Sequence, residues 1–246
     1  MSTPPAPYSP TPKPVTKVWL PNLTRLPRLT AARRFFRWIF RLLCRLVVFV
    51  CTKTRIFGLK NYPRRGPALV VINHLGDPDA VLVIGALPAF PEVFVKIELR
   101  ELPLLRWLGD LLGVIWVHRG QPDRRAISAA LEAFRDGRMV LIAPEGRESL
   151  TGALEAGTEG AAFLALEAGV PVVPVTLTGS EGRRIEDNLK KFHRSPVTVT
   201  IGKPFNLPIQ KKDPGALQEG TRVIMETLSR QLPPEFRGVY AYVKEL

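Results

Sequence analysis

Residues 68–79 read ALVVINHLGDPD, and this stretch decides the fold. Its first five residues, Ala68–Ile72, are apolar throughout and include three β-branched side chains. Such a run predicts a strand that is buried on both faces, which is typical of a parallel sheet covered by helices. The residues that follow are mostly polar or turn-forming. Because functional sites in open α/β sheets lie at the carboxyl ends of strands, the same stretch also predicts a site.

The alternation of apolar runs and helical patterns continues along the chain. Further strands are predicted at Val93–Ile97, Val114–Val117, Met139–Ala143, Val172–Leu177 and Val197–Ile201. Helices are predicted at about 78–87, 103–112, 122–136, 156–168, 183–191 and 215–231. Gly113 and Gly169 stand where two of these helices should end. The pattern predicts an α/β fold with a mainly parallel central sheet flanked by helices.

His74 directly follows the first of these strands. An imidazole is the usual general base near neutral pH, and it works best when a carboxylate orients it. Asp79 lies five residues on, which is about 140° of rotation in a continuous helix. The two can therefore meet only if the chain turns between them, as Gly76 and Pro78 allow. Asp77 is a second candidate partner. The alternative is structural, with the carboxylates capping a turn and His74 as an ordinary polar side chain.

Charged side chains follow other predicted strands as well. The sequence PEGR at residues 144–147 follows one strand, and His-Arg at 118–119 follows another. A carboxylate and a guanidinium at one edge can bind the hydroxyls and the phosphate of a polyol phosphate. A solvated loop is the alternative in each case. The candidate residues for binding such a polyol phosphate are Lys96, Arg119, Glu145, Gly146 and Arg147.

The net charge of +13 is confined to the amino-terminal third of the chain. Residues 1–76 carry 14 lysines and arginines and no acidic residue, whereas the remainder carries 21 basic and 22 acidic residues. A basic arm beside a near-neutral domain indicates an anionic partner, either a nucleic acid or a membrane surface. A nucleic-acid binder should be basic over the folded domain too, so we expect no nucleic-acid partner.

Residues 31–51 read AARRFFRWIFRLLCRLVVFVC, with arginines recurring about every four residues. This spacing predicts a helix over 31–55, between a Pro-rich leader (1–30) and a folded domain (56–246). Its uncharged runs are far shorter than the ~20 residues that span a bilayer. The helix is therefore predicted to lie in the membrane interface with its arginines toward an anionic leaflet. A helix packed on the domain is the alternative, and both can hold at once. The expected membrane-binding residues are Arg33, Arg34, Arg37, Trp38, Arg41 and Arg45.

Four ordered sequence blocks resemble the glycerolipid acyltransferases, in particular the 1-acyl-sn-glycerol-3-phosphate (lysophosphatidic acid) acyltransferases. The family block N-H-x4-D is matched at residues 73–79, and G-x-I-x-x-x-R at 113–119. F-P-E-G-T-R is matched in part at 143–146, and V-P-x-x-P-V at 170–175. The resemblance covers about residues 60–205. It implies that His74 and Asp79 form the catalytic pair. Further motif residues, with structural roles, would be Asn73, Pro144, Pro171 and Pro174.

The resemblance also implies the reaction and its setting. The expected activity moves a fatty acyl chain from a thioester donor, acyl-CoA or acyl-carrier protein, to a lysophosphatidic acid-type acceptor in phospholipid biosynthesis. No metal or other cofactor is expected, and the protein should sit peripherally on the cytoplasmic face of the cell membrane. Arg147-Glu148 stand where the family has Thr-Arg. Glycerol-3-phosphate or another lysophospholipid therefore stays open as acceptor, as does a non-catalytic lipid-binding role.

The sequence also lacks the G-x-S-x-G elbow of serine acyl-enzymes, and neither cysteine ends a predicted strand. Direct attack by an acceptor hydroxyl is therefore expected rather than a covalent acyl-enzyme.

Overall fold

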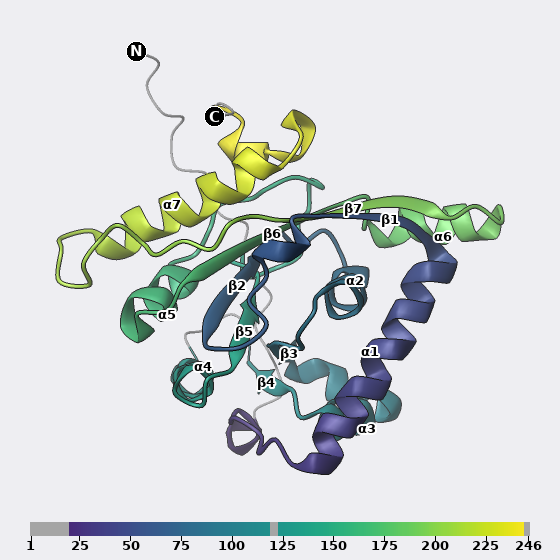
Figure 1. Ribbon diagram of the computed structural model, residues 1–246, viewed down its shortest axis with the longest axis horizontal. Helices are drawn as coiled ribbons and strands as arrows, with labels where there is room; N and C mark the ends of the chain where they lie inside the picture. Colours follow the sequence, from purple (N-terminus) through teal and green to yellow (C-terminus); the bar gives the residue numbers. More distant parts are fainter. Residues whose placement is uncertain (1–19, 119–122, 244–246) are drawn as a thin grey trace.

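Figure 1 shows the computed structural model, which describes residues 20–118 and 123–243. Within these ranges seven strands form one sheet in the order β1-β7-β6-β2-β5-β3-β4. The strands are β1 (Thr52–Phe57), β2 (Ala68–Ile72), β3 (Glu92–Lys96), β4 (Ile115–Val117), β5 (Met139–Ile142), β6 (Val172–Thr178) and β7 (Ser195–Ile201). Neighbouring strands run parallel, except that β6 and β7 pair antiparallel. The predicted mainly parallel sheet is confirmed.

Helices cover both faces of this sheet (Figure 1). They are α1 (Ala31–Cys51), α2 (Pro78–Ala86), α3 (Pro103–Leu112), α4 (Arg124–Arg135), α5 (Gly160–Ala168), α6 (Gly182–Lys190) and α7 (Ala216–Gln231). Leu69 and Val71 of β2 pack with α4, α5 and α7, whereas Val70 and Ile72 pack with α2 on the opposite face. β2 is therefore buried on both sides, as its uninterrupted apolar sequence predicts.

The first strand was not predicted. The helix expected over 31–55 ends at Cys51, and residues 52–57 form β1, which pairs with β7 along its whole length. The prediction is therefore wrong for residues 52–55, which belong to the sheet. β1 is a short edge strand whose alternating Thr, Lys, Thr and Arg follow an apolar helical run without a break. A periodicity of two over so few residues is easily hidden by the helical pattern before it.

α1 packs on the domain with its arginine stripe facing inward, opposite to the predicted orientation. The acceptors are backbone carbonyls: Asp110 and Leu111 for Arg33, Leu112 and Gly113 for Arg37, Leu87 for Arg41, and Gly85 for Arg45. These carbonyls lie at the carboxyl ends of α2 and α3, where N–H partners are missing and the helix dipole favours cations. The stripe therefore docks the helix, and its predicted contact with lipid is wrong for Arg33, Arg37 and Arg41. Arg34 and Trp38 stay exposed.

Arg37 makes the strongest of these contacts. Its Nη1 and Nη2 atoms lie 2.7 Å from the two carboxylate oxygens of Glu92, and both side chains are buried. Arg138 approaches the same carboxylate at 3.5 Å. Because Glu92 is the first residue of β3, the pair fastens α1 to the sheet. Sequence reasoning did not identify Glu92, since nothing in its neighbourhood marks it as the partner of a residue 55 positions away.

Replacement of Glu92 by glutamine is expected to lower the free energy of unfolding by about 3–5 kcal/mol, because Arg37 is left buried without its counter-ion. Urea unfolding followed by circular dichroism measures the loss. Lys190→Ala, which breaks the exposed pair with Glu186, is the control and should change little. Equal stability of Glu92→Gln and wild type would contradict the buried pair.

With its arginines inward, α1 presents its apolar side outward. The exposed apolar members are Phe35, Phe36, Trp38, Leu42, Leu43, Leu46, Val47, Phe49 and Val50. α3 packs beside α1 and adds Leu104 and Trp107, which are 71% and 61% exposed. An apolar surface this extensive indicates a binding face. None of the helices in the described residues is long and apolar enough to cross a bilayer.

Candidate active site

The predicted site residues gather where β2, β5 and β6 end. Asn73, the first residue after β2, joins two of these strands. Its side-chain amide donates to the Leu177 carbonyl at 2.9 Å, and its side-chain oxygen accepts from the Leu177 N–H at 2.8 Å. Asn73 is buried, so both bonds lie out of water. They fix the end of β2 against β6, and thereby fix where His74 begins.

His74 and Asp79 meet because the chain turns between them, as predicted. His74 Nδ1 lies 2.8 Å from Oδ2 of Asp79, which sits in the first turn of α2. The N–H groups of Leu75 and Gly76 donate to the same oxygen at 2.6 and 3.0 Å. The Asp79 side chain is buried, whereas that of His74 is 30% exposed. An ionised carboxylate can only accept, so Nδ1 carries the imidazole proton and Nε2 presents its lone pair.

Asp77, the second candidate partner, does not contact the imidazole ring through any observed hydrogen bond. Its side chain is 84% exposed, and its Oδ1 lies 3.9 Å from the Lys96 ammonium nitrogen. The structure thus selects Asp79 as the orienting carboxylate. The same contact places Lys96, at the end of β3, beside the segment of residues 73–77 between β2 and α2, which we call the histidine loop. Arg119, the other cation predicted at this edge, lies outside the described residues.

Nearby carboxylates raise the pKa of His74 above its ordinary value of 6.5. Burial alone would lower that pKa, but the hydrogen bond that the ring donates to Asp79 and the charges of Asp79, Glu148 and Glu145 outweigh it. Burial also raises the pKa of Glu145 to about 7, against the lowering effect of the two N–H groups that it accepts. The surroundings therefore stabilise the imidazolium that a general base becomes on accepting a proton.

Glu145 fixes the histidine loop to the loop after β5. Its Oε1 accepts from the His74 N–H at 3.0 Å, and its Oε2 accepts from the Glu155 N–H at 2.8 Å. Gly146 turns the chain with a φ of 70°, a conformation that glycine adopts without strain. The Ser149 N–H then donates to the His74 carbonyl at 2.8 Å. Glu145 is buried and each of its oxygens accepts a backbone N–H, so it positions His74, and its contact with acceptor hydroxyls stays a prediction.

Arg147 is turned toward Glu155. Its Nε lies 2.8 Å from Oε2 of Glu155, its Nη2 makes a second contact, and its side chain is 9% exposed. Glu155 Oε1 also accepts from the Leu150 N–H at 2.7 Å. The pair closes the loop over 145–155, and the contact of Arg147 with phosphate stays a prediction. Sequence reasoning missed Glu155, because it belongs to none of the four blocks.

The three motif prolines have structural positions, as the resemblance implies. The carbonyl of each proline accepts a backbone N–H from a neighbouring segment. The Thr158 N–H donates to Pro144 at 2.8 Å, the Leu69 N–H to Pro171 at 2.9 Å and the Gly202 N–H to Pro174 at 2.8 Å. The Pro171 and Pro174 bonds join β6 to β2 and to the residue after β7, and the Pro144 bond joins the loop after β5 to the segment before α5.

The described part of this edge offers a base but no paired nucleophile. The Ser149 hydroxyl, the nearest in sequence to the third block, donates to the Ala153 carbonyl at 2.6 Å. Cys44 and Cys51 are free cysteines of α1, and no observed hydrogen bond joins either of them to His74. An oriented imidazole with an accessible nitrogen can take a proton from a hydroxyl that a substrate supplies.

Comparison with known proteins places the chain in a family. The sequence model of the Acyltransferase family matches residues 53–178. A chloroplastic 1-acyl-sn-glycerol-3-phosphate acyltransferase, LPAT1 of Arabidopsis thaliana, is 28% identical over 176 residues, which are 67% of this chain and 49% of that protein. A lyso-ornithine lipid O-acyltransferase of Pseudomonas aeruginosa is 35% identical over 165 residues, 65% of this chain and 60% of that one. The chain spans about half the length of the first of these relatives.

A solved structure shares the fold. The crystal structure of the 1-acyl-sn-glycerophosphate acyltransferase PlsC from Thermotoga maritima superposes with a TM-score of 0.67 at 23% identity, over 81% of this chain and 79% of that one. The family match begins one residue after β1 begins and ends with the last residue of β6, so it contains the whole histidine site. The chain therefore belongs to the Acyltransferase family.

Proposed function

We propose that this protein transfers a fatty acyl chain from a thioester donor to the free hydroxyl of a lysophosphatidic acid-type acceptor. The observation that carries the proposal is the 2.8 Å contact between His74 Nδ1 and the buried Asp79 carboxylate at the carboxyl end of β2. The relatives named as 1-acyl-sn-glycerol-3-phosphate acyltransferases support the choice of acceptor.

His74 acts as the general base in this proposal. Its Nε2 takes the proton of the acceptor hydroxyl while the hydroxyl oxygen attacks the thioester carbonyl. The tetrahedral intermediate then collapses, the carbon–sulfur bond breaks, and the imidazolium returns its proton to the leaving thiolate. Asp79 keeps the tautomer and stabilises the charge on the ring. Proton, acyl group and thiol are all accounted for without a metal ion or further cofactor.

Lys96 and Arg119 are the residues proposed to bind the acceptor phosphate. Lys96 stands 3.9 Å from Asp77 beside the histidine loop. Arg147 is not assigned to the acceptor, because Glu155 already engages its guanidinium. That engagement favours one second candidate, a lyso-lipid acceptor with a head group other than phosphate. The lyso-ornithine lipid O-acyltransferase at 35% identity supports including it.

An acyl-transfer assay on the purified full chain tests the activity. Acyl-CoA and acyl-carrier protein serve as donors, with lysophosphatidic acid, glycerol-3-phosphate, lysophosphatidylcholine and lyso-ornithine lipid as acceptors. Thiol release and the mass of the product lipid are measured together. We expect release only with an acceptor present and the fastest transfer to lysophosphatidic acid. A faster reaction with lyso-ornithine lipid would select the second candidate, and no release with any pair would refute acyl transfer.

We also propose that the protein attaches peripherally to the cytoplasmic face of the cell membrane through the apolar side of α1. The exposed side chains of α1 and the neighbouring Leu104 and Trp107 of α3 support this attachment. Phe35 and Trp38 stack with their ring centroids 6.2 Å apart, so the two rings form one apolar surface on the first turns of the helix. Insertion of these side chains, rather than the arginine stripe, then supplies the binding energy.

Replacement of Trp38 and Phe49 together by serine is expected to lower partitioning onto phospholipid vesicles by about 10²–10⁴-fold, since each buried side chain of this size contributes roughly 1.5–3 kcal/mol. Vesicle flotation measures the partition coefficient. Both residues are more than half exposed, so the fold should not change. Tyr242→Ser, at an exposed aromatic residue of the carboxyl-terminal segment, is the control. Unchanged flotation of the double variant would refute attachment through α1.

A further inference from the structure

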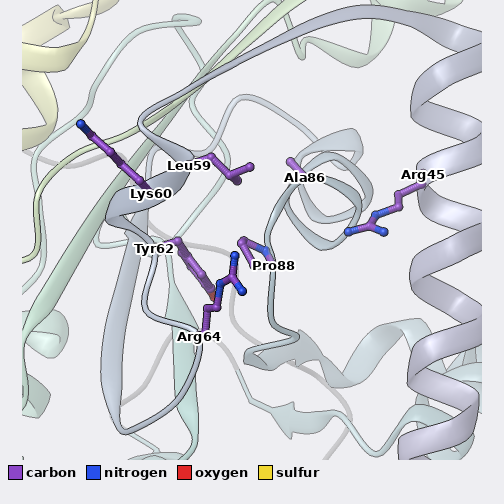
Figure 2. A pocket seen from close by; sticks show the side chains of 7 residues that line it. All are labelled: Arg45, Leu59, Lys60, Tyr62, Arg64, Ala86 and Pro88. Carbon is purple, nitrogen blue, oxygen red and sulfur yellow. The ribbon is translucent and has the colours of Figure 1, made fainter.

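A second cationic site lies at the end of the sheet opposite to His74. Its cavity of about 650 Å³ is lined by Arg45, Leu59, Lys60, Tyr62, Arg64, Ala86 and Pro88 (Figure 2). Leu59–Tyr62 precede β2, and Ala86 ends α2, whereas His74 follows β2. The length of β2, about 16 Å at the usual rise per residue, therefore separates the two sites. The cavity has the size of a small-molecule pocket.

The charges around this cavity are all positive. Arg45, Lys60 and Arg64 are exposed, and none of the described residues that line the cavity is acidic. Figure 2 shows Arg45 and Arg64 extending toward the segment Ala86–Pro88 from two sides, while the Lys60 ammonium points away from it. Arg45 uses its Nε to donate to the Gly85 carbonyl at 3.2 Å, which leaves its two terminal nitrogens for a ligand. Two guanidinium groups facing one hollow suit a phosphate.

The walls of the cavity are held in place by the fold. Gly58 has a φ of 69°, and a Cβ atom there would lie 2.0 Å from the Ile201 carbonyl oxygen. The Asn61 amide donates to that same oxygen at 2.9 Å. On the other side, Arg41 and Arg45 donate to the carbonyls at the end of α2, which offsets the negative end of the helix dipole. The segment before β2 and the end of α2 therefore form a fixed frame for an anion.

Apolar side chains flank the cations. Leu59, which lines the cavity, is 46% exposed. Phe57 and Leu46, near Lys60 and Arg45 in the sequence, are 54% and 58% exposed. A soluble anion such as free phosphate makes no use of these side chains. An anionic phospholipid uses both kinds of group, because its phosphate meets the arginines and its acyl chains meet the apolar neighbours.

We propose that this cavity binds the phosphate of an anionic phospholipid, as a lipid site separate from the catalytic edge. The role of the site at a membrane rests on the proposed attachment, whereas lipid binding by the cavity itself rests neither on the attachment nor on acyl transfer. Arg45 and Arg64 are the ligands of the phosphate, and Lys60 lies at the rim. The site makes attachment selective for anionic lipids, which insertion of apolar side chains alone does not.

Binding of a soluble short-chain lipid to the full chain tests this site without a membrane. Dihexanoylphosphatidylglycerol, dihexanoylphosphatidylcholine and inorganic phosphate are titrated by calorimetry below the critical micelle concentrations. Phosphatidylglycerol should bind most tightly. Arg64→Gln should weaken phosphatidylglycerol binding about fivefold, and the double variant Arg45→Gln/Arg64→Gln should weaken it about 25-fold. Each substitution removes one cation near the lipid phosphate, and each such cation contributes about fivefold. Lys212→Gln, in the turn before α7 on the far side of the molecule from α1, is the matched control (Figure 1).

Each outcome bears on the proposal. Phosphatidylglycerol binding that is unaltered by Arg64→Gln would overturn it. Inorganic phosphate that binds as tightly as the lipid, with the same loss in Arg64→Gln, would overturn the assignment to a lipid. Flotation on phosphatidylcholine vesicles and on an equimolar mixture with phosphatidylglycerol separates the site from the attachment. If the wild type binds soluble phosphatidylglycerol but floats with neither vesicle, the cavity is supported and the membrane attachment fails.

Discussion

Replacement of His74 by alanine is expected to lower kcat/KM for acyl transfer by about 10²–10⁴-fold, the usual contribution of a general base. The loss should be larger if the imidazole also positions the acceptor hydroxyl. The measurement is thiol release with saturating donor and a lysophosphatidic acid acceptor. Trapping by acid quench and mass spectrometry should find no acyl group on the protein, because the acceptor hydroxyl attacks the thioester directly.

The His74→Ala variant should keep its fold. The backbone of residue 74 still donates to Glu145 and accepts from the Ser149 N–H, and the missing ring was only partly buried. Its unfolding midpoint and vesicle flotation should match those of the wild type. His193→Ala, at an exposed histidine in the turn after α6, is the matched control and should keep full activity. Wild-type rates in His74→Ala, or an acyl-enzyme, would refute the proposed mechanism.

The pH dependence of the wild type should report the same group. The neighbouring carboxylates raise the pKa of His74 above 6.5, and the base must be neutral to act. kcat/KM should therefore be constant at higher pH and fall as the pH drops through a value above 6.5. An acid limb that lies below 6.5 would mean that another group limits the rate.

Strands that are apolar throughout could be predicted from the sequence, because burial on both faces leaves no polar alternation to read. β2 matches its predicted residues at both ends, and the other predicted strands shift by no more than two residues at either end. β1 could not be predicted in this way. It lies at the sheet edge, and three of its six residues, Lys53, Thr54 and Arg55, are polar at exposed or half-exposed positions. Its one strand partner among the described residues is β7, which lies about 140 residues away.

The histidine site could be predicted for the same kind of reason. A polar pair and a turn directly after a buried strand can only lie at the carboxyl edge of the sheet, so His74 and Asp79 had one place to meet. The partners of charged side chains that pair across a long stretch of sequence could not be predicted. Arg37 turned inward because Glu92 stands opposite to it, and Arg147 turned away from the acceptor because Glu155 engages it. An arginine in a sequence shows its charge but not which carboxylate or carbonyl it will meet.

Asp79→Asn should lower kcat/KM by about 10- to 100-fold. The lower end is the loss expected when a hydrogen bond to a charged group becomes one between neutral groups, and the upper end is the loss of the whole charged bond, worth about 1.5–3 kcal/mol. The amide has two ways to face the ring. If its NH₂ faced Nδ1, the ring would keep its proton on Nε2 and lose its activity as a base. The N–H groups of Leu75 and Gly76 decide between the two, because both point at the same carboxylate oxygen as Nδ1. They require an acceptor there, so the amide oxygen should face the ring and the tautomer should be kept.

The pH profile distinguishes this outcome from a change of tautomer. With the Asp79 charge gone, the pKa of His74 loses the two largest contributions that raise it, while those of Glu148 and Glu145 remain, and the acid limb of kcat/KM should move to lower pH. Asp77→Asn is the matched control, since that side chain is 84% exposed and its removal should leave the limb in place. Asp79→Ala should lower kcat/KM more than Asp79→Asn does. The alanine leaves two buried N–H groups without an acceptor, which costs about 1–3 kcal/mol for each group and disturbs the turn that holds His74. A loss near 10⁴-fold in Asp79→Asn with no shift of the limb would show that the amide has turned, and that the two N–H groups do not control the tautomer of His74.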